Sequence, residues 1–250
     1  MITDPWFYVA AVPAILIVGI SKGGFGGGLG LLAVPLMSLV VSPAQAAAIM
    51  LPILCLMDLV GLWSFRGQGD KGLIRVLIPA ALIGIIIGAF SFSYLSDQHL
   101  KLIVGSIAVL FTLNYWLRPR QRDPKPASTL RGGFWGVVTG FTSFSVHAGG
   151  PPLNIYLLPL RLDKSVYIGT TIIMFAAINY LKLIPYAMLG QFTTANLTTA
   201  AVLALLAPVG VRLGYWMHHR ISETWFYRIC FVLLFLTGSK LLYDALIPLP

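Results

Sequence analysis

Long uncharged apolar segments are the feature that most constrains how this chain can fold. The segments 76–96 and 102–117 contain no charged side chain, and several similar segments follow one another between short polar joints. A helix needs roughly 17–25 mostly apolar residues to cross a bilayer. Only 10% of the residues are charged, whereas soluble domains have about 25%. The sequence therefore predicts an all-α polytopic membrane protein.

Glycine-rich stretches interrupt two of the apolar segments. The first segment, 5–41, contains SKGGFGGGLG at Ser21–Gly30, and as one helix it would be about 55 Å long, too long for a single crossing of a hydrocarbon core of about 30 Å. The second segment, 132–160, contains TSFSVHAGGPP at Thr142–Pro152 and would be about 44 Å long, so a tilted or kinked single helix is an alternative there. We expect both segments to form re-entrant hairpins of two short helices, with the glycines at the bend.

The two halves of the chain are similar at an offset of 121 residues, which matches Gly19 with Gly140 and Asp58 with Asn179. Each half has a broken segment followed by three apolar segments. Because three is an odd number of crossings, the halves would run through the membrane in opposite directions. Inverted repeats with broken helices are typical of transporters that bind substrate near the midplane.

This pattern divides the chain into a first repeat over 1–118, a cytoplasmic linker over 119–130 and a second repeat over 131–250. The expected elements are a hairpin over 5–41 and helices over about 43–65, 73–95 and 98–118, and then a hairpin over 132–160 and helices over about 164–189, 196–216 and 222–246.

Most lysine and arginine residues lie in four joints, at 66–75, 118–131, 161–164 and 212–223. If both broken segments are hairpins, all four joints fall on one face of the membrane, as expected for cytoplasmic loops, which carry an excess of Lys and Arg. Single crossings would divide them between the two faces. We therefore expect a multi-pass protein of the bacterial inner (plasma) membrane with cytoplasmic basic loops and periplasmic termini. The net charge of +9 then reflects orientation and not nucleic-acid binding.

The two bends are expected to meet inside the bundle, because irregular backbone at membrane depth must be buried in protein or line a watery cavity. Half-helices beginning near Gly27 and at Pro151–Pro152 would direct their positive N-terminal ends at this cavity, which favours an anion. Lys22 adds a full positive charge at the first bend, and a buried ammonium needs an anionic partner. The alternatives are that Lys22 extends to an interface or forms a permanent salt bridge.

Other polar side chains within the apolar segments are further candidates for the site. Asp58 is either a structural counter-ion or a proton carrier. His147 lies in the second bend and either acts on substrate or protons or fills a packing position. Asn179 matches Asp58 in the repeat and lies one helical turn from Lys182. The role of Lys182 is left open, since it could extend to the outer interface.

The sequence contains no convincing catalytic triad, metal-binding set or phosphate-binding loop, so we expect no enzyme activity, no cofactor and no metal. His218 and His219 lie beside Arg220 at a joint and have no supporting zinc ligands. Cys55 and Cys230 lie in apolar segments and are expected to act as small hydrophobic residues without a disulfide.

Two stretches carry a resemblance to a known family. They are GISKGGFGGGLGLLAVPLMSLVVSPAQAAAIMLPILCLMDLVG in the first half and GFWGVVTGFTSFSVHAGGPPLNIYLLPLRLDKSVYIGTTIIMFAAINYLKLIPY in the second. They resemble the sulfite exporter TauE/SafE family over almost the whole chain. The resemblance implies a polytopic inner-membrane carrier that moves small sulfur-containing anions, such as sulfite or organosulfonates, usually outward.

We therefore expect a secondary transporter that exports such an anion by alternating access, with one repeat rocking against the other, and with ion coupling through Asp58 or His147. A passive anion channel and an accessory membrane protein without transport activity are the alternatives. The expected partners are the anion and the lipid bilayer, and a homodimer is one possible assembly. The predicted substrate-binding residues are Ser21, Lys22, Gly23, Gly24, Gly26, Gly27, Gly28, Thr142, Ser143, Ser145, His147, Gly149, Gly150, Asn154 and Asn179.

Overall fold

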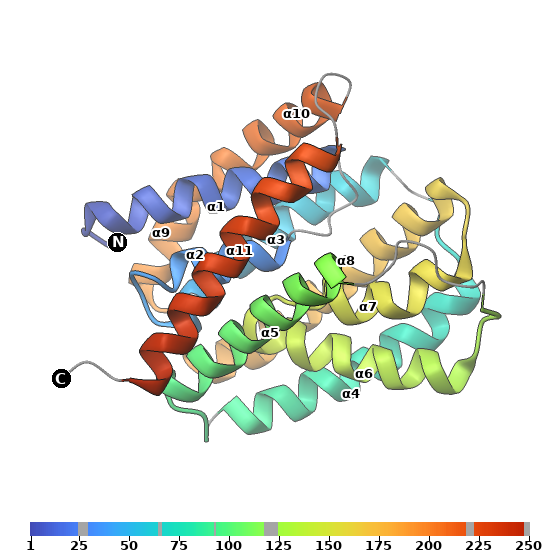
Figure 1. Ribbon diagram of the computed structural model, residues 1–250, viewed down its shortest axis with the longest axis horizontal. Helices are drawn as coiled ribbons and strands as arrows, with labels where there is room; N and C mark the ends of the chain where they lie inside the picture. The colour runs from blue at the N-terminus through green and yellow to red at the C-terminus, as the bar shows by residue number, and fades with distance from the viewer. Residues whose placement is uncertain (25–29, 65–66, 93, 118–124, 219–222, 248–250) are drawn as a thin grey trace.

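A computed structural model describes residues 1–24, 30–64, 67–92, 94–117, 125–218 and 223–247 of the chain. These residues are helical throughout their regular structure and form no strand (Figure 1). In the first half the elements are α1 (Pro5–Gly24), the 3₁₀ turn η1 (Gly30–Leu32), α2 (Ala33–Met37), α3 (Pro43–Ser64), α4 (Lys71–Phe92) and α5 (Asp97–Leu117). In the second half they are α6 (Thr129–Val146), α7 (Gly150–Leu157), the 3₁₀ turn η2 (Leu158–Leu160), α8 (Lys164–Met188), α9 (Thr194–Ala204), α10 (Leu206–His218) and α11 (Glu223–Leu246).

Six helices in the described part of the chain are long and apolar enough to cross a bilayer, namely α1, α3, α4, α5, α8 and α11. A seventh span is formed if α9 and α10, which meet at a bend of 41°, are counted together. Large apolar side chains such as Trp63, Phe90 and Leu205 are exposed on the outside of the bundle, where lipid would cover them. The prediction of an all-helical polytopic membrane protein is confirmed.

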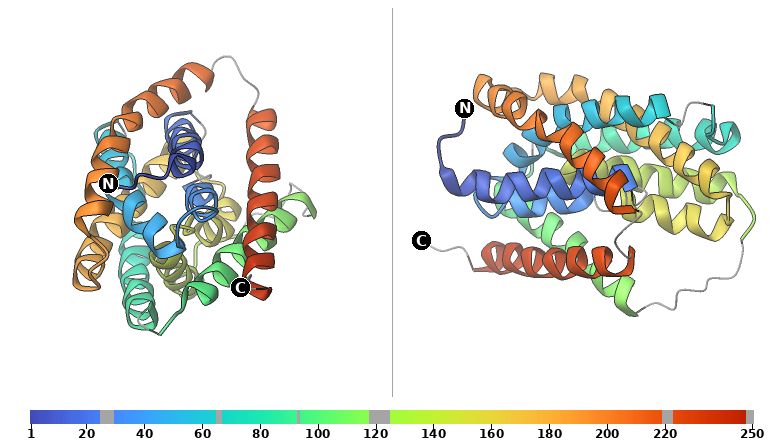
Figure 2. Two further views of the ribbon diagram at one scale, coloured as in Figure 1. Left: turned by 90° about the vertical axis from the view of Figure 1, so that its left-hand side faces the viewer. Right: turned by 90° about the horizontal axis from the view of Figure 1, so that it is seen from above.

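The two broken segments return to the end of the bundle from which they started. Figure 1 shows that the chain after α2 lies at the end where α1 begins, and that α7 leads back to the end where α6 begins. The start of α1 and the end of α11 lie at one end of the bundle, whereas α4, α6 and α8 begin at the opposite end (Figures 1 and 2).

Each broken segment has one long arm and one short arm, so the expectation of two short helices per hairpin is wrong. The first arms, α1 and α6, have 20 and 18 residues, about 30 and 27 Å at the rise of an α-helix. The returning helices α2 and α7 have 5 and 8 residues. The helix-breaking residues lie late in each segment, which leaves a long uninterrupted helix before them. In the first segment, residues 25–29 at the expected bend lie outside the described residues.

Close helix pairs combine elements from both halves of the chain. α1 packs along α10 and α4 along α6, while α5 packs against α11 and α3 against α8. Glycine allows the backbones to approach: a Cβ on Gly19 would lie 2.8 Å from the Cα of Gly210, and a Cβ on Gly140 would lie 2.0 Å from the carbonyl oxygen of Ala81. Such small-residue contacts are typical of packed membrane helices. The two halves of the sequence are therefore interlocked in space.

The interior of the bundle is built around α1, α2 and α3. Viewed from the end at which the chain begins, α1 and α2 lie inside a ring of other helices (Figure 2, left). α3 contributes a nearly continuous run of buried side chains from Ala46 to Met57 and packs against α8 and α9. This arrangement brings the middle of α3 and α8 next to the two broken segments.

Candidate functional site

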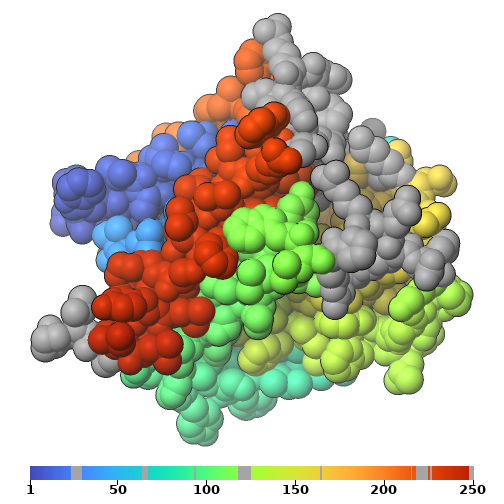
Figure 3. All heavy atoms as spheres, viewed as in Figure 1, coloured from blue at the N-terminus to red at the C-terminus, as the bar shows by residue number. Residues whose placement is uncertain are grey.

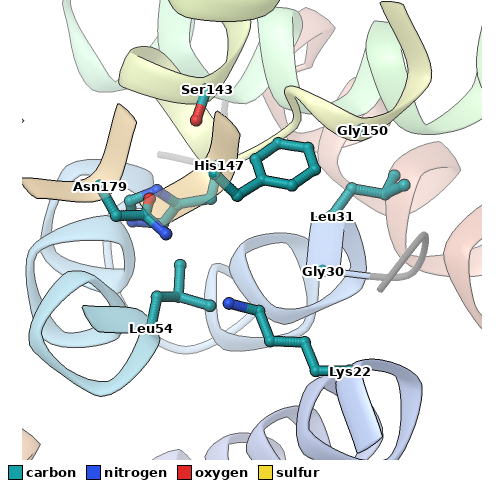
Figure 4. Close-up of a pocket in the computed structure, with 9 residues that line it drawn as sticks. Lys22, Gly30, Leu31, Leu54, Ser143, His147, Gly150 and Asn179 are labelled. Carbon is teal, nitrogen blue, oxygen red and sulfur yellow. The ribbon is translucent and has the colours of Figure 1, made fainter. Parts of the chain in front are cut away.

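A small cavity lies between the two broken segments, where α3 and α8 also meet (Figure 4). Its volume of about 30 Å³ exceeds the roughly 10–15 Å³ that a single water needs. The cavity therefore has room for a very small group, such as a water pair or the head of a small anion. Its lining residues are Lys22, Gly30, Leu31, Leu54, Ser143, His147, Gly150, Phe175 and Asn179.

A buried ion pair on one side of the cavity joins α1, α3 and α8. The Nζ atom of Lys22 donates to Oδ1 of Asp58, and Nδ2 of Asn179 donates to Oδ2 of Asp58 at 2.6 Å. The side chain of Asp58 is only 3% exposed, and that of Lys22 is 18% exposed. Charge-assisted hydrogen bonds to both carboxylate oxygens compensate for the loss of water around the buried charge. Lys22 therefore forms a salt bridge in the structure. A salt bridge was one of the alternatives that the sequence left open for this residue.

A second buried ammonium group lies on the other side of the cavity. Lys182 is fully buried, so the interpretation in which it extends to the membrane surface is wrong. Its Nζ atom lies 2.9 Å from the carbonyl oxygen of Ser143, 3.1 Å from Oγ of Ser143 and 2.6 Å from Nδ1 of His147. These three acceptors match the three hydrogens of a lysine ammonium. None of them carries a negative charge.

His147 is held in one orientation by the end of α6. It caps this helix in the left-handed conformation, with φ 56°, and its ring stacks near Tyr186 at 6.2 Å between centroids. Nε2 lies 2.9 Å from the carbonyl oxygen of Ala47 on α3. Because a carbonyl only accepts hydrogen bonds, Nε2 must carry a hydrogen, which leaves Nδ1 to accept from Lys182 in the neutral ring.

The second broken segment also brings a helix start to the cavity. Gly150 begins α7 and lines the cavity, so the positive end of the helix dipole faces it. Pro151 and Pro152 follow in the first turn and have no N–H to leave unpaired. In the first segment the described chain resumes at Gly30, the start of η1, which also lines the cavity. The helix start expected near Gly27 therefore falls outside the described residues.

Five predicted binding residues line this cavity directly, and others lie near it without lining it. Lys22, Ser143, His147, Gly150 and Asn179 line the cavity. Gly26, Gly27 and Gly28 lie outside the described residues.

Two predicted hydroxyls on α6 form hydrogen bonds within their own helix, and Ser21 on α1 lies outside the cavity lining. Thr142 Oγ1 donates to the Val138 carbonyl at 2.8 Å, and Ser145 Oγ donates to the Phe141 carbonyl at 2.9 Å. These are local bonds within the helix, as is common for Ser and Thr. Ser21 is fully buried but does not belong to the cavity lining.

The remaining predicted residues serve packing or a neighbouring contact. A Cβ on Gly23 would lie 2.2 Å from a carbonyl oxygen of α10, and a Cβ on Gly149 would lie 2.9 Å from Cβ of Ser143. Gly24 is the last residue of α1. Asn154 on α7 accepts a hydrogen bond from the Tyr167 hydroxyl of α8 at 2.6 Å. Gly23, Gly149 and Asn154 thus support the broken segments and do not belong to the cavity lining.

Sequence reasoning missed the apolar wall of the cavity and the place of Lys182. The wall consists of Leu31, Leu54 and Phe175, which look like any other apolar residues of a membrane helix. Lys182 could have been found from its position one turn after Asn179 on α8, but its acceptors come from α6. In the described part of the chain no group of three or more His, Cys, Asp or Glu residues could hold a metal ion, and Cys55 and Cys230 are free and buried.

Comparison with known proteins identifies the family of the chain. Searches of curated proteins and of solved structures gave no match. The family model described as sulfite exporter TauE/SafE matches residues 11–241. This range contains the second broken segment, the first one from residue 11 onward, and every residue that lines the cavity. The chain therefore belongs to the sulfite exporter TauE/SafE family of membrane transporters.

Proposed function

We propose that this protein is a secondary transporter that exports a small sulfur-containing anion, sulfite or an organosulfonate, across the inner membrane by alternating access. Its family supports membrane export of this class of anion. The observation that carries the proposal is the buried site, which holds two ammonium groups, Lys22 and Lys182. Among the described residues, Asp58 is the one carboxylate that pairs with either of them, and it pairs with Lys22.

The charge balance of this site favours an anion. Asp58 offsets the charge of Lys22, whereas the partners of Lys182 are a carbonyl, a hydroxyl and an imidazole. A protonated Lys182 thus leaves one net positive charge in a region from which water is largely excluded, and such a charge is costly unless it is paired. A bound monoanion would supply the missing negative charge, with the start of α7 as a further favourable contact.

The packing of the helices supports the inverted repeat. The repeat matches α1 with α6, α3 with α8, and α4 with the bent pair α9–α10. Under this match the α1–α10 pair corresponds to the α6–α4 pair, and both pairs are present. The α3–α9 and α8–α4 pairs are related in the same way. Asp58 and Asn179, which the repeat matches at an offset of 121 residues, are hydrogen-bonded to each other. The site then lies on the axis that relates the two repeats.

This packing argues against the expectation that one repeat rocks as a rigid body against the other. If the first half moved as a rigid body against the second, it would have to separate α1 from α10 and α4 from α6, whose backbones touch at glycines. Densely packed contacts of this kind do not deform continuously. We therefore propose that the moving bodies combine elements of both halves, with α1 and α10 in one body and α4 and α6 in the other.

Orientation and ion coupling complete the proposal. We propose that the basic joints face the cytoplasm and that both termini face the periplasm, because cytoplasmic loops carry the excess of Lys and Arg. We propose that transport is coupled to an ion, and protons are our candidate. In this scheme Asp58 is the counter-ion of Lys22, since both of its oxygens are already engaged, which leaves His147 as the proton candidate.

Flux into proteoliposomes tests the function. Purified protein should give saturable uptake of sulfite or of an organosulfonate such as sulfoacetate, and a pH gradient should stimulate it. Lys22→Met together with Asp58→Asn removes the ion pair without leaving either charge alone, and should reduce the uptake strongly. Lys240→Met is the matched control, because Lys240 lies on α11, is exposed and pairs with Asp244; its uptake should equal that of the wild type.

Two results would contradict the transporter proposal. Unitary currents in a planar bilayer would show a channel, because a carrier must change conformation for each anion that it moves. Absence of both flux and anion binding in correctly folded protein would favour an accessory role in the membrane.

A further inference from the structure

Lys182 is the buried group of the proposed anion site whose protonation the proposed function leaves open. It is fully buried, and it does not itself line the cavity, but its partners Ser143 and His147 do. A permanently charged lysine without a carboxylate partner is costly inside a membrane protein. Its hydrogen bonds therefore raise the question of when this side chain is charged.

The geometry provides hydrogen-bond partners for both protonation states of the lysine. When Lys182 carries three hydrogens, each has one acceptor within 3.1 Å, namely the Ser143 carbonyl, Ser143 Oγ and His147 Nδ1. When it carries two, it can donate to the Ser143 carbonyl and to His147 Nδ1 and accept from the Ser143 hydroxyl, because a hydroxyl both donates and accepts. Neither state leaves a buried amine hydrogen without a partner.

The contact between Lys182 and His147 also allows the proton to be shared. Nζ and Nδ1 are 2.6 Å apart, and Nε2 of His147 is committed to the Ala47 carbonyl at 2.9 Å. A proton that moves from Nζ to Nδ1 gives a neutral amine and an imidazolium whose two N–H groups are both hydrogen-bonded. The total charge of the pair is the same in either position, so the pair behaves as one group that holds one exchangeable proton.

The surroundings of Lys182 contain few other groups that could take over this role. α8 packs against α3, α4 and α6. The charged residues Lys71 and Arg75 on α4 and Arg131 on α6 lie at the beginnings of their helices. The titratable groups near Lys182 are Asp58 and Cys55 on α3, Lys22 on α1 and His147 at the end of α6, together with Tyr180 and Tyr186 on α8 itself. Of these, Asp58 is held by Lys22 and Asn179.

We propose that Lys182 and His147 together bind one proton when the anion binds and release it when the anion leaves. The inference rests on the proposed function, because it requires an anion in the cavity lined by Ser143 and His147. The anion stabilises the positive pair and the positive pair stabilises the anion, so the two ligands favour each other's binding by the same factor. Each monoanion then travels with one proton in the same direction, which makes the loaded site neutral. The outward anion gradient and the opposing pH gradient together set the net flux, so the protein exports when the anion gradient is the larger of the two.

Calorimetry of anion binding measures the proton directly. Ethanesulfonate is a suitable probe because it stays a monoanion between about pH 5 and 9, so any proton taken up on binding belongs to the protein. Titrating the detergent-solubilised protein in two buffers of different ionisation enthalpy gives the number of protons bound per anion. We expect a value that approaches one within this pH range for the wild type and for the control Lys240→Met.

Two variants identify the carrier of the proton. Lys182→Arg keeps a charge that cannot be removed, so anion binding should continue with no proton uptake. His147→Asn keeps a residue that tolerates the left-handed backbone but removes the imidazole acceptor. Because a hydrogen bond to the charged form favours that form, losing this acceptor should lower the pH at which proton uptake is half-maximal. The expected decrease is about one unit, the equivalent of one hydrogen bond.

The outcomes distinguish this inference from the proposed function. Ethanesulfonate binding without proton uptake by the wild type from pH 5 to 9, or undiminished uptake in Lys182→Arg, would contradict the inference and leave the anion site intact. A His147→Asn variant with an unchanged pH of half-maximal uptake would contradict the shared proton. If folded protein bound neither ethanesulfonate nor sulfite at any pH, the proposed function would be contradicted as well.

Discussion

Replacing Asp58 with asparagine tests whether the ion pair at the centre of the bundle stabilises the fold. Oδ1 of Asp58 accepts from Lys22, and Oδ2 accepts from Asn179 at 2.6 Å. Asparagine has the same shape but turns one acceptor into an NH₂ group, which then faces a donor. It also removes the counter-charge of the Lys22 ammonium, whose side chain is 18% exposed.

The expected cost follows from these contacts. Removing one partner of a buried ion pair typically costs about 3–5 kcal/mol, because the other charge is left buried and unpaired. The partial exposure of Lys22 lets water reach the ammonium, so the lower end applies, and we expect Asp58→Asn to lower the free energy of unfolding by about 3 kcal/mol. This is a large part of the roughly 5–15 kcal/mol that stabilises a typical protein.

A double-mutant cycle in mixed micelles measures this cost. Unfolding by SDS, followed by tryptophan fluorescence, gives the free energies of unfolding of Asp58→Asn, Lys22→Met and the double variant. The double variant should be more stable than the sum of the single losses predicts, by at least about 1.5 kcal/mol, because it leaves no charge unpaired. Lys240→Met, which breaks an exposed pair with Asp244 on one helix, should cost no more than about 0.5 kcal/mol. A loss below about 1 kcal/mol for Asp58→Asn, or an additive cycle, would refute the reasoning.

Substitutions at four further positions test the fold by the same unfolding assay. Gly140→Ala should destabilise the protein by about 2 kcal/mol or more, because the added Cβ would lie 2.0 Å from the Ala81 carbonyl oxygen. Gly133→Ala on the same helix meets nothing within 4 Å and should be neutral or stabilise by up to about 1 kcal/mol; equal effects at the two positions would contradict the close approach of α4 and α6. Tyr186→Phe should cost about 1–3 kcal/mol, because the hydroxyl donates to a buried carbonyl of α6 at 2.7 Å, and an unchanged stability would show that the carbonyl has another partner. Thr193→Ala should cost about 0.5–2 kcal/mol, since its hydroxyl caps the first turn of α9 at 3.2 Å, while Thr193→Ser should restore most of the loss.

The sequence by itself was sufficient for the fold class, the family and part of the site. Apolar segment length determines which segments can cross a bilayer, because lipid satisfies no backbone polar group and only a helix satisfies its own. Charged and amide side chains in such segments, such as Lys22, Asp58 and Asn179, stand out because they are costly there, and all three meet at one point in the structure. The inverted relation of the repeats stays a prediction that the helix pairing supports.

Only the tertiary structure decided which helices touch and what Lys182 does. The close pairs α1–α10 and α4–α6 depend on how distant small residues such as Gly19 and Gly210 fit against each other, and shape complementarity of this kind leaves no periodic signal in either helix alone. The acceptors of Lys182 include a backbone carbonyl and a histidine held in a left-handed conformation at the end of α6. A lysine on one helix has the same sequence signature whether it reaches the membrane surface or a buried imidazole, because its environment is made by other segments of the chain.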